Sequence, residues 1–121
     1  IISTSVKIPI SNLGVSNTIR GAMANWSKTL ANELGGHGVT VNNILPGFTK
    51  TNRLKSLFEN KSKKENCSIE DVKNRAIQTI PAGRLGEIDD VSYAVMFLCS
   101  PRASYINGIN LPVDGGRTAS L

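Results

Sequence analysis

The stretch GVTVNNILPG at residues 38–47 decides how this chain folds. Its β-branched and apolar residues favour a short strand that reaches residue 45, and Pro46 and Gly47 end that strand. A helix is predicted before it, over residues 16–34. Apolar residues recur there at steps of three and four and form one stripe: Ile19, Ala22, Met23, Trp26, Leu30 and Leu34.

The residues around this helix predict a strand–helix–strand unit. Ser16 and Asn17 are candidate N-caps, and two glycines end the helix. Trp26 is interpreted as a core or interface anchor. Residues 1–5 are apolar and then hydroxylated, which is typical of the end of a buried strand. This spacing predicts a right-handed crossover and a parallel sheet. Because the chain opens inside a strand, we expect it to be a piece of a longer protein.

The second half of the chain predicts two further helices and a final strand. Residues 68–79 are predicted as a helix with Ser68 as its cap. Residues 87–99 are predicted as the next helix, with acidic residues at its positive N-terminal end. Residues 109–113 alternate as a strand. In contrast, residues 48–66 are polar and basic and show no such pattern.

Charge is concentrated in one short segment. The 121 residues carry 14 Lys and Arg against 9 Asp and Glu, a net charge of +5. Residues 50–64 contain one acid, Glu59, against six basic residues, so the whole excess lies there: Lys50, Arg53, Lys55, Lys61, Lys63 and Lys64. The remainder is neutral, which argues against a protein that is basic all over, such as a chromatin or ribosomal scaffold.

Several other classes of protein are disfavoured. A hydrophobic content of 40% is ordinary for a globular protein, and no apolar run approaches the ~18 residues of a membrane span. The first residues lack a signal-peptide pattern. Cys67 and Cys99 lack metal-ligand spacing and His37 is the only histidine, so we expect no metal site. Unpaired thiols favour a reducing, cytoplasmic location.

Three segments together resemble one protein family. They are the helix end and strand at residues 30–47, the GRLG turn and helix at 83–98, and the YING to VDGG terminus at 105–116. In this order and spacing they resemble the C-terminal half of a short-chain dehydrogenase/reductase, of the 3-oxoacyl-[acyl-carrier-protein] reductase type.

The resemblance implies an α/β fold, namely part of a Rossmann-like, doubly wound parallel sheet. Residues 1–121 are then expected to be the C-terminal portion of one NAD(P)-binding domain and to supply its strands 5 to 7. The half with the glycine-rich dinucleotide turn is expected to be absent from this chain. The residue that selects NAD or NADP belongs to that half. The implied cofactor is therefore NAD(P)H, with the choice left open.

The family's chemistry is hydride transfer between a nicotinamide and a carbonyl or alcohol, assisted by a Ser, a Tyr and a Lys. The resemblance places these catalytic roles on Ser3, Ser16 and Arg20, so Ser-x-x-x-Arg stands where the family has Tyr-x-x-x-Lys. A phenol with a pKa of ~10 can be brought toward neutral pH, whereas an alkyl hydroxyl is far less acidic. Arg20 keeps its charge and suits ribose hydroxyls of the cofactor, but it does not relay a proton.

Three interpretations follow from this replacement. The protein is an oxidoreductase with a modified proton path through Ser16 and water, a weak or inactive relative that still binds cofactor, or a binding protein in which Ser16 only caps a helix. The segment after the strand resembles the family's PGxxxT contact with the nicotinamide. That contact would use five residues: Pro46, Gly47, Phe48, Thr49 and Thr51. The alternative interpretation of the segment is a strand-ending turn.

Residues 50–66 fall where the family has its flexible, substrate-covering loop. Their positive charge suits an acidic substrate or partner, such as a phosphate-bearing acyl thioester or an acidic carrier protein, and the alternative is a solvated loop. Nucleic acid is disfavoured because Phe58 is the only aromatic residue there. The expected partners are a small carbonyl or alcohol substrate and further copies of the chain, because the family forms dimers or tetramers. Trp26 and Phe97 suit such subunit contacts.

Overall fold

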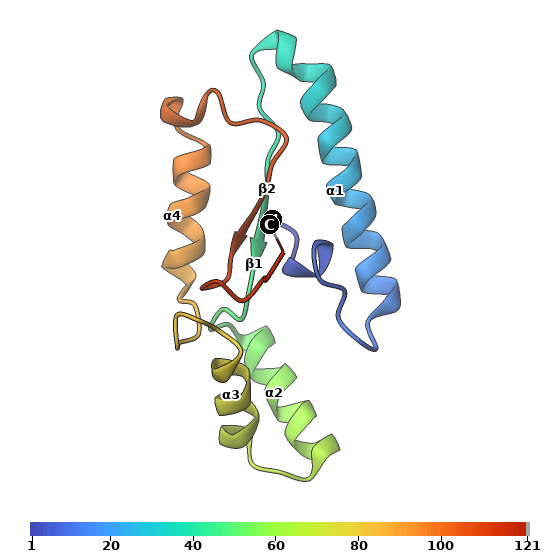
Figure 1. Ribbon diagram of the computed structural model, residues 1–121, viewed down its shortest axis with the longest axis vertical. Helices are drawn as coiled ribbons and strands as arrows, with labels where there is room; N and C mark the ends of the chain where they lie inside the picture. The colour runs from blue at the N-terminus through green and yellow to red at the C-terminus, as the bar shows by residue number, and fades with distance from the viewer. Residues whose placement is uncertain (121) are drawn as a thin grey trace.

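The computed structural model describes residues 1–120, which form helices around two short strands (Figure 1). No helix among these residues is long and apolar enough to cross a membrane. In chain order the elements are η1 (Thr4–Val6), α1 (Gly14–Leu34), η2 (Gly35–His37), β1 (Asn43–Pro46), α2 (Asn52–Glu65), α3 (Ile69–Gln78), α4 (Ile88–Leu98), η3 (Pro101–Ala103) and β2 (Asn110–Val113), where η marks a turn of 3₁₀-helix.

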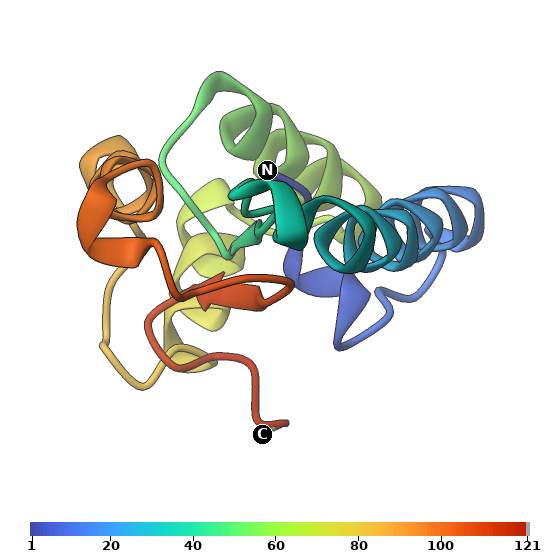
Figure 2. The ribbon, with the colours of Figure 1, turned by 90° about the horizontal axis from the view of Figure 1, so that it is seen from above.

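The sheet is parallel, as the strand–helix–strand spacing predicts. β1 pairs with β2, with Ile44 opposite Leu111. On the other side of β1 lies the extended start of the chain, whose Ile2 N–H donates to the Ile44 C=O at 2.8 Å. Seen from above, α1 and α4 lie on opposite sides of the strands (Figure 2). The prediction of a doubly wound, parallel α/β fold is therefore confirmed.

Two of the predicted strands are shorter than expected. The chain start is extended only up to Ser3, because Thr4–Val6 turn into 3₁₀-helix. β1 begins at Asn43 instead of residue 38. The residues before it are held by side-chain amides in place of a strand ladder, since Asn107 Oδ1 accepts from the Val41 N–H at 2.8 Å. Local β-propensity therefore overestimated the length of regular pairing.

The helix α1 starts two residues earlier than predicted. Gly14 is its first residue, so Ser16 and Asn17 lie inside its first turn and not at its cap. The N-cap position is Leu13, which makes no side-chain capping bond. The prediction that Ser16 or Asn17 caps this helix is wrong, because both side chains bond elsewhere.

The predicted apolar stripe of α1 is largely exposed. Ile19 and Trp26 are 59% and 56% exposed, so Trp26 is not a core anchor within this chain. The buried face carries small residues instead: Ala24, Ser27 and Ala31. Small side chains let neighbouring segments approach the helix closely, and Asn107 Nδ2 donates to the Ala31 C=O at 2.9 Å. An interface role for Trp26 stays a prediction.

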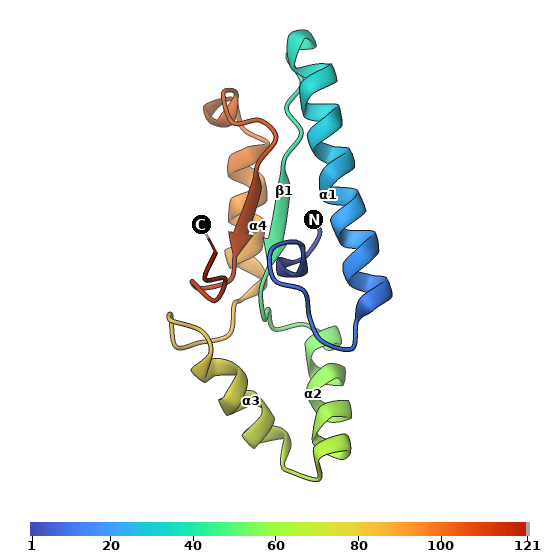
Figure 3. The ribbon, with the colours of Figure 1, turned by 45° about the vertical axis from the view of Figure 1, so that its right-hand side comes forward.

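Residues 50–66, expected as a flexible loop, contain the helix α2 instead. Its buried side chains stand four residues apart and pack against residues of α3 and of the turn after it. These buried apolar residues form one cluster: Leu54, Phe58, Val72, Ile80 and Leu85. The α2–α3 pair lies beyond the carboxyl end of β1 (Figure 3). The loop prediction missed this i, i+4 pair because charged residues surround it. A substrate-covering role stays a prediction.

The helices α3 and α4 begin where the sequence predicts. The Ser68 hydroxyl accepts from the Asp71 N–H at 3.0 Å, and the Asp71 carboxylate accepts in turn from the Ser68 N–H at 3.3 Å. The Ser68 hydroxyl also donates to that carboxylate and lowers the pKa of Asp71. At α4 the Glu87 N–H donates to Asp90 Oδ2 at 2.7 Å. Capping residues were therefore readable from the sequence for these two helices.

Candidate functional site

The carboxyl end of β1 and the N-terminal end of α1 lie toward the same end of the molecule (Figures 1 and 3). In parallel α/β sheets, ligands bind outside the carboxyl ends of the strands. Ser16 and Arg20, two of the three residues proposed for catalysis, lie at the start of α1, and the residues proposed for the nicotinamide lie at the end of β1 and directly after it. Both groups therefore occupy the end of the sheet where this architecture binds ligands.

Ser16 and Arg20 are joined across one turn of α1. Arg20 Nε donates to Ser16 Oγ at 3.1 Å, and Arg20 Nη1 donates to the Ile2 C=O at 2.8 Å. Both side chains are half-buried. The guanidinium is therefore held between the helix and the extended chain start. Because the Ser16 oxygen accepts from Arg20, its own proton is left to donate to another group.

Ser3, the third proposed catalytic residue, has a local task. Its Oγ accepts from the Ser5 N–H at 3.1 Å and so caps η1. No hydrogen bond joins Ser3 to Ser16 or Arg20 within residues 1–120. Ser5, the neighbouring hydroxyl, is buried, and its Oγ has no partner in that part of the chain. The contact of Ser3 with a substrate oxygen stays a prediction.

A cleft of about 690 Å³ opens beside the Ser16–Arg20 pair. Asn12, Ser16 and Arg20 supply polar groups to its lining. Apolar side chains make up most of the rest: Ile1, Ile2, Leu13, Val15, Ile19 and Met23. An apolar lining with a few polar groups suits an organic molecule that presents a single reactive oxygen to the hydroxyl.

The turn that follows β1 is fixed from two sides. The Gly86 N–H donates to the Phe48 C=O at 2.9 Å, and the Lys50 N–H donates to the Gly86 C=O at 2.8 Å. Gly47 packs so closely on Asp114 that an added Cβ would lie 2.5 Å from the Asp114 Cβ. Glycine at position 47 is therefore required by packing against the residue that follows β2, whatever else the turn does.

Thr49 has both of its backbone polar groups free. Its N–H and C=O have no hydrogen-bond partner among the described residues, and the residue is half-buried. One free donor beside one free acceptor matches the needs of a carboxamide. The turn therefore fits the carboxamide group of a nicotinamide.

Thr51 has a structural task of its own. It is exposed, and its Oγ1 accepts from the Leu54 N–H at 3.2 Å, which caps α2. Its hydroxyl proton is still available to a ligand. Pro46 is the last residue of β1 and pairs with Val113 of β2. Of the five residues expected at the cofactor, Thr49 has the backbone groups best suited to it.

Two residues that the sequence did not single out also shape this region. Asn12 lines the cleft with a positive φ of 67°. Arg117 lies over the ring of Phe48, with its guanidinium carbon 4.5 Å from the ring centre, and donates from Nε to Thr79 Oγ1 at 3.1 Å. Asn in a loop is a turn signal that could have identified the first. A lone Arg near the chain end carries no pattern, so the second had no signal.

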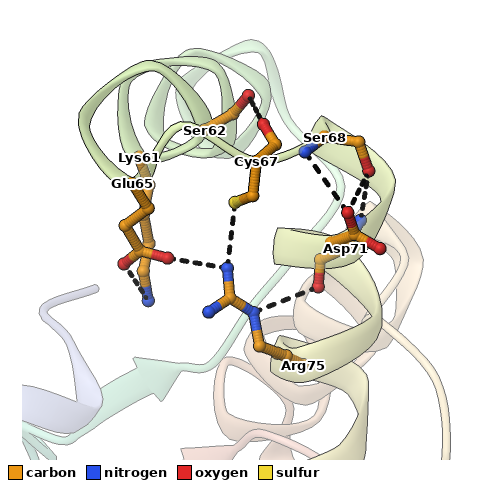
Figure 4. Close-up of polar contacts among 7 residues, drawn as sticks. All are labelled: Lys61, Ser62, Glu65, Cys67, Ser68, Asp71 and Arg75. Atoms are coloured by element: carbon orange, nitrogen blue, oxygen red, sulfur yellow. Dashed lines mark hydrogen bonds and ion pairs between the residues drawn. The ribbon is translucent and has the colours of Figure 1, made fainter.

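A polar network at the turn between α2 and α3 holds these two helices together (Figure 4). Arg75 Nη2 donates to Glu65 Oε2 at 2.6 Å and to Cys67 Sγ at 3.1 Å, and the Ser62 hydroxyl donates to the Cys67 C=O at 2.6 Å. The Glu65 carboxylate raises the pKa of Arg75. Among residues 1–120 no group of three His, Cys, Asp or Glu is placed to hold a metal. These hydrogen bonds join α3 to the end of α2.

Comparison with known proteins agrees with the fold and with the motif order. A family model described as enoyl-(acyl carrier protein) reductase matches residues 1–118. The short-chain reductase protein NovJ of Streptomyces niveus is 38% identical over 108 residues, which cover 88% of this chain and 40% of NovJ. The chain belongs to the short-chain dehydrogenase/reductase family.

Two further members of this family illustrate its range. The 3-oxoacyl-[acyl-carrier-protein] reductase FabG of Vibrio harveyi is 35% identical over 114 residues, which cover 93% of this chain and 42% of FabG. The crystal structure of YwfH, an NADPH-dependent reductase involved in bacilysin biosynthesis, superposes with a TM-score of 0.92 at 31% identity, over 99% of this chain and 46% of YwfH. The chain thus spans about two fifths of the length of the curated relatives it matches.

Proposed function

We propose that this chain is the catalytic portion of an NAD(P)(H)-dependent oxidoreductase that acts on a carbonyl or alcohol, with a 3-oxoacyl thioester as the model substrate. Its proton path is non-standard, because Ser16 and Arg20 take the places of a tyrosine and a lysine. The observation that carries the proposal is the bond from Arg20 Nε to Ser16 Oγ at 3.1 Å beside an apolar cleft.

Ser16 acts in this proposal as a hydrogen-bond donor to the substrate oxygen. Its own oxygen is occupied by Arg20, so the hydroxyl proton is directed away from the guanidinium. The fixed positive charge of Arg20 stabilises negative charge that develops on the substrate oxygen during reduction. Neither residue has a proton to release near neutral pH, so water supplies the proton that completes the alcohol. Ser3 is proposed as a second donor to the same oxygen.

The nicotinamide, when bound, supplies or accepts the hydride. The backbone N–H and C=O of Thr49 are proposed to hold its carboxamide, with Thr51 as a further donor. The turn of Pro46, Gly47 and Phe48 keeps these groups in place, and Arg20 has further guanidinium N–H groups for ribose hydroxyls. YwfH is NADPH-dependent and this chain resembles it, yet we leave the choice between NAD and NADP open.

The cellular setting is part of the same proposal. We propose a cytoplasmic location, because the thiols of Cys67 and Cys99 are free. We also propose a homodimer or homotetramer, because large apolar side chains are exposed on α1 and α4. A second candidate function is a cofactor-binding relative without turnover. The observation that favours it is that the Ser16–Arg20 pair contains no group that titrates near neutral pH.

The decisive experiment is absorbance at the nicotinamide band with NADH and NADPH across a panel of carbonyls that includes 3-oxoacyl thioesters. It uses the full-length protein, because the half with the dinucleotide turn is expected outside this chain and the isolated 121-residue fragment is expected to be inactive. We expect turnover that falls about 100-fold in Ser16→Ala, the loss typical of one donor to a developing oxyanion. Ser92→Ala is the matched control, since Ser92 bonds only the Asp89 C=O within α4. Cofactor binding without turnover of any carbonyl establishes the second candidate instead.

The pH profile separates this mechanism from one that uses a titrating acid. We expect kcat to be flat between about pH 6 and pH 9, because a guanidinium and an alkyl hydroxyl are groups whose ordinary pKa values lie far above that range. Arg20→Lys removes the planar fork that bonds both Ser16 Oγ and the Ile2 C=O, so its kcat is expected to be lower with the same flat profile, because an amine also ionises above that range. A bell-shaped profile in the unaltered protein contradicts the proposed role of this pair.

A further inference from the structure

Asn17 forms hydrogen bonds with both ends of the turn formed by residues 10–13. Its side-chain Nδ2 donates to the Ile10 C=O at 2.8 Å, and its Oδ1 accepts from the Ile10 N–H at 3.3 Å. Its backbone N–H donates to the Leu13 C=O at 2.8 Å. The first and last residues of the turn are therefore both fastened to the first helical turn of α1.

The turn itself has a defined geometry. The Leu13 N–H donates to the Ile10 C=O at 3.2 Å, which closes a four-residue turn. Asn12, its third residue, has a φ of 67°. A positive φ at this position is typical of a type II turn, and Asn adopts it at lower cost than most residues other than Gly. The Ile10 C=O thus receives two donors, one from the turn and one from Asn17.

This turn forms one wall of the cleft that Ser16 and Arg20 also line. Asn12 and Leu13 belong to that lining, and Ser16 immediately precedes Asn17 in the chain. Adjacent residues of α1 therefore hold the two parts of the site. Ser16 presents the hydroxyl that Arg20 bonds, and Asn17 holds the turn whose residues Asn12 and Leu13 line the cleft.

We infer that Asn17 is a positioning residue that fixes the residue 10–13 wall relative to the Ser16 hydroxyl and so sets how tightly the carbonyl substrate is held. The inference rests on the proposed function. Asn17 is not among the residues that line the cleft, so it acts through the turn without touching the substrate. Loosening the wall therefore weakens substrate binding and leaves cofactor binding unchanged.

The first arm of the test measures amide hydrogen exchange in the ligand-free protein. In Asn17→Ala the Ile10 and Leu13 amides are expected to exchange at least about tenfold faster, because both side-chain bonds are lost. Asn17→Asp keeps the acceptor for the Ile10 N–H, so that amide is expected to stay better protected than in the Ala variant. Thr18→Ala is the control. It removes only a bond from Thr18 Oγ1 to the Gly14 C=O inside the same helical turn, and it should change neither amide.

The second arm measures steady-state kinetics. In Asn17→Ala the KM for the carbonyl is expected to rise about fivefold to tenfold, which corresponds to one net hydrogen bond. The kcat and the Kd for the nicotinamide cofactor are expected to change less than about twofold, and Thr18→Ala should match the unaltered protein. Unchanged exchange in Asn17→Ala, or an unchanged KM, overturns the inference. If the unaltered protein reduces no carbonyl, the proposed function fails. The exchange arm alone then decides whether Asn17 holds the turn.

Discussion

The helix α1 and the α2–α3 pair reverse what their sequences suggest. α1 has the cleanest apolar stripe in the chain, yet Ile19 and Trp26 on that stripe are more than half exposed. The α2 segment is the most charged part of the chain, yet Phe58 is buried in a cluster shared with α3. An apolar stripe therefore indicates that a helix has a face suited to burial, but it does not indicate which element packs against that face.

The difference has a simple physical source. Two apolar residues one turn apart are sufficient to bury a helix edge when a partner helix follows at once in the chain. α3 begins only a few residues after α2, and the bond from Arg75 to Glu65 ties the two helices together. The stripe of α1, in contrast, is exposed at Ile19, Met23 and Trp26, and the buried residues of the helix are small ones: Ala24, Ser27 and Ala31.

The largest expected effect comes from truncating Phe58. This change tests whether the α2–α3 pair has a buried apolar core despite its charged sequence. Phe58→Ala removes a buried ring that contacts Phe48 at 6.1 Å between ring centres, and we expect it to cost about 3–5 kcal/mol. Trp26→Ala, on the exposed stripe, should cost about 0.5 kcal/mol or less in the monomer. Urea unfolding followed by circular dichroism measures both. Equal losses would contradict the comparison.

The next largest effect concerns the turn that links the sheet to α2. An alanine at position 47 meets the Asp114 backbone and Cβ, so Gly47→Ala should destabilise the protein by about 1–3 kcal/mol. Gly36→Ala, at the end of α1, has open space around the added methyl and should be close to neutral. The melting temperatures of the two variants measure the difference. An unchanged melting temperature in Gly47→Ala would show that the turn can move to accommodate the methyl group.

The next prediction compares the stability effects of two serines, Ser68, which caps a helix, and Ser16, which does not. Ser68 caps α3, so Ser68→Ala should cost about 1 kcal/mol of stability. Ser16 lies inside the first turn of α1 and caps nothing, so Ser16→Ala should cost only a few tenths of a kcal/mol while lowering activity. Parallel melting curves and turnover measurements check this. A large stability loss in Ser16→Ala would return that residue to a structural role.

The smallest effect is a pH dependence where the α2–α3 pair joins α4. The Arg84 guanidinium holds the pKa of Asp90 at about 2, below its ordinary value of 3.8. Because the folded-state pKa is lowered, this contribution to stability is present above about pH 4 and is lost as the pH falls through about 2. Asp90→Asn should therefore lose less of its melting temperature between pH 4 and pH 2 than the unaltered protein does. Asp89→Asn, one position away, is the control and should follow the unaltered protein.

Sequence reasoning succeeded for features set by short-range rules. The cap at Ser68 and the acidic start of α4 were readable because each depends on residues close together in the chain. The parallel sheet and the family were readable from the order and spacing of whole segments. The pairing of Ser16 with Arg20 follows from their i, i+4 spacing in a helix. The hydrogen bonds between Asn17 and Ile10 could not be predicted from the sequence. An Asn that caps a helix and an Asn that bonds the preceding loop look the same there.

What the sequence by itself determined is the family, the residue types at the candidate site, and the order of the larger elements other than α2. By the family resemblance, Ser16 and Arg20 are proposed to stand where a phenol and an amine are expected, and an alkyl hydroxyl is far less acidic than a phenol. Only the tertiary structure decided which faces are buried and which polar groups are free. The exposed stripe of α1, the buried edge of α2 and the unpaired backbone groups of Thr49 all depend on what packs against them. Burial and hydrogen bonding between distant segments are properties of three-dimensional neighbours, which local periodicity does not contain.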